Sequence, residues 1–150
     1  MKAIITCALT GVLTDPEVHN VPVTPEQMAD EARRAYDAGA SMVHCHFRQQ
    51  TPGMGRFPTW DAEIAGEICD AIRQKCPDIL INMSTGVMED DISGPVACLE
   101  RVRPEMAALN AGSLNYLKAR RNGTWAWPPL LFANSVDKIE AFAKKMDELN

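Results

Sequence analysis

Two histidines separated by a single residue are the pair in this chain best suited to chemistry. His44 and His46 lie in the apolar run of residues 41–47, which has the length and composition of a β-strand. Side chains two positions apart on a strand point to the same side, so the two imidazoles could bind one zinc ion. A catalytic zinc usually has three protein ligands, and the third is not evident here. The alternative is that the two histidines only form hydrogen bonds at the strand end.

Further polar residues that could bind a substrate follow the apolar runs. Arg48 comes two residues after His46 and offers a fixed cation for a carboxylate or phosphate, or for a salt bridge to a loop acid. Ser84, Thr85 and Gly86 supply hydroxyl groups and a flexible backbone suited to carboxylate oxygens. Asn110 closes a later run. We predict that all five residues contact the substrate.

Four short apolar runs alternate with amphipathic segments. The runs predict strands over residues 3–9, 41–47, 79–84 and 106–110. Helices are predicted from the capping box at Thr24 to about Ala38, over residues 60–75 after Thr59, within residues 90–101, and after Ser135 to about residue 148. Residues 120–132, rich in tryptophan and proline, are predicted to form a loop.

The strict alternation of strands and helices predicts an α/β fold with a parallel sheet. Two architectures compete for it, a small open doubly wound sheet and the first half of a (β/α)8 TIM-type barrel with about four βα units. Both place their active sites at the C-terminal edge of the sheet, which is where the histidines, Ser84 and Asn110 are predicted to lie.

Composition narrows the class of protein. The chain has 15 Lys and Arg against 20 Asp and Glu, a net charge of −5, which argues against nucleic acid or an anionic membrane as a partner. The first residues do not resemble a secretory signal and no run is long enough to span a membrane, so we expect a cytoplasmic protein. The five cysteines are scattered without a CxxC pair, as expected of reduced core thiols.

Several segments together resemble one family, the β-keto acid cleavage enzymes. The similar stretches are residues 5–11, 22–27, 38–40, 43–48 (Val-His-Cys-His-Phe-Arg), 84–86 (Ser-Thr-Gly), 103–107 and 110–115 (Asn-Ala-Gly-Ser-Leu-Asn). Their order and spacing make the resemblance specific, although each piece alone would be weak.

The resemblance implies a (β/α)8 barrel and a divalent metal, usually zinc. It implies that His44 and His46 are metal ligands and that Ser84 and Asn110 lie in the keto-acid pocket. It also implies the reaction, in which a small-molecule β-keto acid and acetyl-CoA give acetoacetate and a new acyl-CoA. The metal would stabilise the enolate, and Arg48 could neutralise a carboxylate or a phosphate of CoA.

The sequence departs from the family pattern in residues and in length. Leu13 and Ala108 stand where the family has a glutamate and a threonine, so substrate specificity should differ. Family members are roughly twice as long, about 250 residues or more for such a barrel. Residues 1–150 are therefore expected to be the amino-terminal part of a single barrel domain. The resemblance places the third metal ligand, a glutamate, and a catalytic aspartate in the other half.

Two other functions fit the same residues. A metal-dependent hydrolase on the same barrel would use zinc-activated water and need no CoA. A non-catalytic half-barrel would instead bind a partner or assemble through its open strand edges and the aromatic loop at Trp125, Trp127, Pro128 and Pro129. Because open edges must be paired by the other half or by another copy, we also expect a homo-oligomer.

A polypeptide consisting only of residues 1–150 is expected to make no acetoacetate from a β-keto acid and acetyl-CoA. The reason is that the third metal ligand and the catalytic aspartate implied by the resemblance lie outside it. An enzyme-coupled acetoacetate assay on purified protein of verified mass tests this, and full turnover at that mass would contradict it.

Overall fold

A four-stranded parallel sheet forms the centre of the molecule. The computed structural model describes residues 3–12 and 14–149, so Leu13 lies outside the described residues. The strands β1 (Thr6–Ala8), β2 (Met42–Cys45), β3 (Leu80–Met83) and β4 (Met106–Ala107) lie side by side in chain order. The register aligns Ala8 with His44, His44 with Asn82, and Asn82 with Met106.

Four helices follow the strands. They are α1 (Pro25–Asp37), α2 (Ala62–Lys75), α3 (Ser93–Val102) and α4 (Val136–Leu149). The capping box at α1 is confirmed, since the Thr24 hydroxyl accepts from the Gln27 amide and the Gln27 side chain accepts from the Thr24 amide. Gly39, at φ 100°, ends that helix in the left-handed region. Within residues 3–12 and 14–149, no helix is long and apolar enough to cross a membrane.

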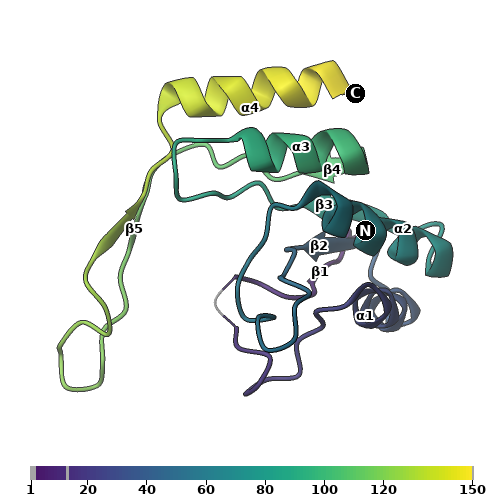
Figure 1. The fold of residues 1–150 in the computed structure, drawn as a ribbon, viewed down its shortest axis with the longest axis horizontal. Helices are drawn as coiled ribbons and strands as arrows, with labels where there is room; N and C mark the ends of the chain where they lie inside the picture. The colour runs from purple at the N-terminus through teal and green to yellow at the C-terminus, as the bar shows by residue number, and fades with distance from the viewer. Residues whose placement is uncertain (1–2, 13, 150) are drawn as a thin grey trace.

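The helices cover one face of the sheet and leave the other uncovered by helices. Helix α1 packs on α2, α2 on α3, and α3 on α4, as Figure 1 shows. Val43 and Ile81 point toward the helices and are fully buried, whereas Leu80 and Met106, on the opposite face, are 42% and 48% exposed. A doubly wound sheet would carry helices on both faces, but sequential strand order with helices on one face is the arrangement of the first half of a (β/α)8 barrel.

The cysteines contribute to the core between sheet and helices. Cys45, Cys69, Cys76 and Cys98 are buried, Cys7 is half-buried, and all five are free thiols. Burial raises the pKa of Cys69 to about 12 and that of Cys98 to about 11. These side chains therefore pack as small apolar groups, as predicted.

Several predicted boundaries are wrong by a few residues. Helix α2 begins at Ala62, because the carboxylate of Asp61, and not Thr59, accepts hydrogen bonds from the first turn. Helix α3 begins at Ser93, ahead of Pro95, because a proline is tolerated in the first turn of a helix. The strand predicted over residues 106–110 pairs with β3 only at Met106 and Ala107.

A β-hairpin spans the loop that was predicted over residues 120–132, of which only residues 130–132 are strand and the rest connects the two strands. Strand β5 (Leu114–Tyr116) pairs antiparallel with β6 (Leu130–Phe132), with Leu114 opposite Phe132 and Tyr116 opposite Leu130. Figure 1 shows the hairpin extending away from the helices. Tyr116 and Phe132 meet edge to face, with ring centroids 6.3 Å apart.

A buried lysine connects α4 to the loop after β3 and to the base of the hairpin. Lys138 is 7% exposed, and its ammonium donates to the carbonyl oxygens of Val87 at 2.8 Å, Glu89 at 2.9 Å and Ala133 at 3.2 Å. Val87 and Glu89 follow β3, and Ala133 follows β6. One cation therefore fixes the loop after β3 and the base of the hairpin relative to each other.

Replacing this lysine should destabilise the fold. In Lys138→Met, the buried carbonyl of Val87 and the partly buried carbonyls of Glu89 and Ala133 lose a charged donor, which should lower the free energy of unfolding by about 2–3 kcal/mol. Urea denaturation followed by circular dichroism measures the change. Lys144→Met is the matched control on the same helix, because that side chain is 76% exposed and its ion pair with Glu140 spans 3.8 Å. Equal stability of the two variants would contradict the role of Lys138.

Candidate functional site

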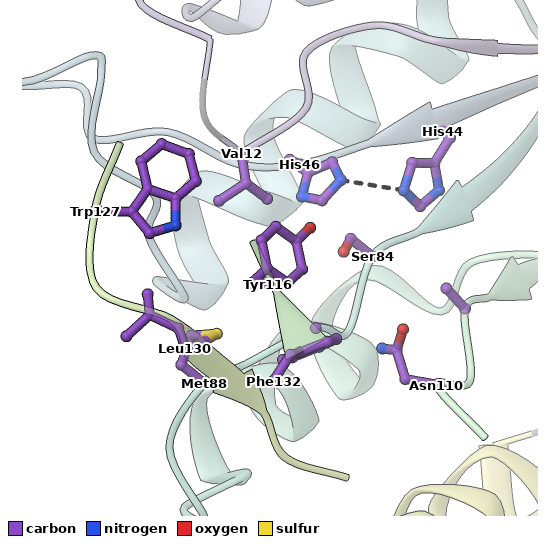
Figure 2. Close-up of a pocket in the computed structure, with 12 residues that line it drawn as sticks. Val12, His44, His46, Ser84, Met88, Asn110, Tyr116, Trp127, Leu130 and Phe132 are labelled. Carbon is purple, nitrogen blue, oxygen red and sulfur yellow. Dashed lines mark hydrogen bonds between the residues drawn. The ribbon is translucent and has the colours of Figure 1, made fainter. Parts of the chain in front are cut away.

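A cavity of about 460 Å³ opens at the C-terminal edge of the sheet. Its polar side is formed by His44 on β2, His46 just after β2, Ser84 and Gly86 after β3, and Asn110 after β4. Figure 2 shows the two imidazoles, Ser84 and Asn110 on one side of this space. The structure therefore brings together five of the seven residues predicted for the site.

The two imidazoles face each other through their Nε2 atoms. The Nε2 atoms of His44 and His46 are 3.2 Å apart, and the ring planes are inclined at 83°. Two nitrogens bound to one tetrahedral zinc at about 2.0–2.1 Å each are separated by about 3.3 Å. The observed spacing fits a shared metal ion.

Asn82 fixes the tautomer of His44. Its Oδ1 lies 3.2 Å from His44 Nδ1, and an amide oxygen only accepts hydrogen bonds, so Nδ1 carries the proton. The lone pair is left on Nε2, the atom that faces His46. A partner of this kind on the far nitrogen is typical of metal-binding histidines.

His46 is held as a neutral imidazole. Burial lowers the pKa of its side chain to about 4, and the neighbouring His44 and Arg48 act in the same direction. Its backbone is fixed by Thr10, whose hydroxyl accepts from the His46 amide and donates to the His46 carbonyl, both at 3.2 Å. A neutral imidazole on a fixed backbone can offer a lone pair to a metal.

The described residues supply only part of a metal site. Among residues 3–12 and 14–149, no group of three or more His, Cys, Asp or Glu side chains is placed to hold a metal ion. His19, the remaining histidine, is exposed in the loop before α1 and does not line the cavity. The donor set is therefore a pair of imidazoles that fits two positions of a zinc site.

Ser84, Gly86 and Asn110 lie close together on the same side of the cavity as the imidazoles. Ser84 is 5% exposed, and its amide donates to the Cys45 carbonyl at 3.0 Å, which extends the pairing of β2 and β3. A Cβ atom on Gly86 would lie 3.5 Å from Asn110 Nδ2 and 3.3 Å from the Phe132 ring. The absence of a side chain at Gly86 thus leaves room for Asn110 and Phe132 to approach this corner.

Thr85 and Arg48 are near the cavity but do not line it. The Thr85 hydroxyl donates to the Ala108 carbonyl and joins the ends of β3 and β4. Arg48 is 1% exposed. Its guanidinium donates to the carbonyl of Gly11 at 2.6 Å and to that of Thr14 at 3.1 Å, with further bonds to residues 55 and 56. Burial lowers the pKa of Arg48. Backbone carbonyls occupy the Thr85 hydroxyl and the Arg48 Nη1 and Nη2 atoms, whereas the buried Arg48 Nε has no hydrogen-bond partner among the described residues. Neither side chain lines the cavity, so the structure does not place them where the predicted substrate contacts would be made.

The hairpin supplies a wall of the cavity that the sequence interpretation missed. Tyr116, Trp127, Leu130 and Phe132 line it, together with Val12, Met88 and Ala108. Of the two tryptophans in the aromatic loop, Trp127 lines the cavity, whereas Trp125 is 49% exposed. The available signals were the apolar-polar-apolar order of residues 114–116 and the apolar run of residues 130–132, and both are short and far apart in the sequence.

Comparisons with known proteins show which family the chain is similar to. The family model described as beta-keto acid cleavage enzyme matches residues 2–150. A 3-keto-5-aminohexanoate cleavage enzyme from Fusobacterium nucleatum subsp. nucleatum is 42% identical over 98% of this chain and 49% of its own length. A 3,5-dioxohexanoate:acetyl-CoA acetone transferase from Paraburkholderia graminis is 36% identical over 77% of this chain and 36% of its own length.

A solved structure supports the fold. The binary complex of ObcA with oxaloacetate superposes with a TM-score of 0.64 at 22% identity, over 86% of this chain and 29% of that protein. The chain spans about half of the length of the curated relatives it matches, or less. Matched from residue 2 to residue 150, it belongs to the beta-keto acid cleavage enzyme family.

Proposed function

We propose that the protein containing this chain transfers an acyl group between a β-keto acid and acetyl-CoA. The bond between C2 and C3 of the keto acid breaks, and C2 joins the acetyl group to give acetoacetate. The acyl group that is left forms a new thioester with CoA. The observation that supports this best is the convergence of two imidazoles, Ser84 and Asn110 in one cavity of a chain from this family.

The metal in this proposal is zinc, bound by His44 and His46 with a further ligand from outside residues 1–150. The 3.2 Å separation of the two Nε2 atoms and the Asn82 contact support it. When bound, a divalent metal polarises a carbonyl oxygen of the substrate as a Lewis acid.

The chain's own residues bind and orient the keto acid. The Ser84 hydroxyl and the Asn110 amide can donate hydrogen bonds to carboxylate or carbonyl oxygens. The buried Thr85 and Arg48 act as positioning residues, because they hold the backbone on both sides of the cavity. The aromatic wall reduces water access and so strengthens the polar contacts inside.

Metal analysis tests the ligand pair. Native-length protein purified without chelator should contain about one equivalent of zinc, and His44→Ala should lose it. Asn82→Leu should weaken zinc binding by about 10–100-fold, because the His44 tautomer is no longer fixed. His19→Ala is the matched control and should keep its zinc. Unchanged zinc in His44→Ala, or protein isolated without zinc, would overturn the assignment.

Acetoacetate formation tests the reaction and the role of Ser84. In the native-length protein, Ser84→Ala should lower kcat/KM for acetoacetate formation by about 10–100-fold, since one hydrogen bond to a charged oxygen is lost. Ser41→Ala is the control, because Ser41 precedes β2 at the opposite edge of the sheet. Ester or amide hydrolysis without CoA would instead favour the hydrolase, and absence of both activities with no bound zinc would favour a binding module.

A further inference from the structure

The cavity has two chemically different sides. Beyond the imidazoles, Ser84, Gly86 and Asn110, its lining is apolar and aromatic and includes Val12, Met88, Tyr116, Trp127, Leu130 and Phe132, of which Phe132 reaches the corner at Asn110. Figure 2 shows Trp127 and Leu130 on the side away from His44 and Asn110, with Tyr116 between the two groups. A substrate whose oxygens contact the polar side would place its remaining substituent against this wall.

The apolar side offers no counter-ion to a charged substituent. Among the described residues that line the cavity, none is Asp, Glu, Lys or Arg. The nearby Lys118 lies over the Trp127 ring at 5.3 Å, and Arg48, whose Nη1 and Nη2 atoms donate to carbonyls, is not part of the cavity lining. A charged group packed against this wall would lose part of its hydration without gaining an ion pair from the described residues, which is costly.

The polar atoms on this side are uncharged. The Trp127 Nε1 atom is buried and has no hydrogen-bond partner in the part of the chain that the structure describes. An indole N–H is a donor only, so it disfavours an ammonium group. Tyr116 adds one hydroxyl group and a large apolar ring.

We infer that the β-keto acid used by this protein carries an uncharged, predominantly apolar substituent. This rests on the proposed function and specifies its substrate class. The substituent packs on the hairpin wall, while the carboxylate and keto oxygens contact the opposite side. The cationic group of a 5-amino-3-oxohexanoate is therefore a poor fit here.

Three keto acids of different charge test the inference on native-length protein. 3-Oxooctanoate carries an apolar tail, 5-amino-3-oxohexanoate a cation and 3-oxoadipate a second carboxylate. With acetyl-CoA, kcat/KM for acetoacetate formation should be at least about tenfold higher for 3-oxooctanoate than for either charged acid. Preference for a charged acid overturns the inference and leaves the proposed function intact. If none reacts, the proposed function fails, and the order of the three Kd values from calorimetry decides the inference by itself.

Two adjacent leucines provide a matched pair of variants. Leu130 lines the cavity, whereas Leu131, which is 57% exposed and paired with Asn115, points to the other face of the hairpin. Leu130→Glu should lower kcat/KM for 3-oxooctanoate by about tenfold or more and raise the relative rate of the cationic acid. Leu131→Glu should change neither by more than about twofold. Because both side chains are half-exposed, both variants should fold, and equal effects would overturn the role of the wall.

Discussion

The alternation of side chains along β2 is the constraint on which the site depends. Val43 and Cys45 are fully buried against the helices, so His44 and His46 must point to the opposite face. Pairing with β3 then sets Asn82 beside His44. A shift of one residue would bury both imidazoles among apolar helices and expose a valine and a thiol, which the core energetics oppose. The core and the site thus fix the same register.

Much of the α/β framework could be predicted from the sequence. The apolar runs and the capping box at Thr24 are local signals, and they located the parallel strands and the start of α1. The start of α2 was predicted too early. Thr59 and Asp61 are both of a type that caps helices, and only the structure shows which oxygen reaches the first turn. The hairpin was missed because its strands are three residues each and a long segment separates them.

The predicted site residues also fall into two groups, those that could be located from the sequence and those that could not. Four predicted residues reach the cavity from strands whose direction is set by the sheet. These are His44 on β2, and His46, Ser84 and Asn110 after β2, β3 and β4. Arg48 lies three residues past β2, as Asn110 does past β4, but its Nη1 and Nη2 atoms donate to loop carbonyls that no sequence pattern reveals. The aromatic wall depends on where the hairpin folds back, which is a tertiary contact. The position of a residue at the C-terminal edge of the sheet was therefore predictable, whereas the hydrogen bonds and contacts that it makes within the loops were not.

The cavity is assembled from the parallel sheet and from the hairpin, and these two parts can change in sequence to different degrees as such a protein diverges. Its polar side is carried by consecutive strands of the sheet. The alternate side chains of these strands pack in the core and cannot change without disturbing it. Its apolar side is carried largely by an exposed hairpin that shares few buried residues with that core. Loops tolerate sequence change far better than the elements they connect. Drift in the hairpin can therefore alter which molecules are accepted while the imidazole pair stays in place.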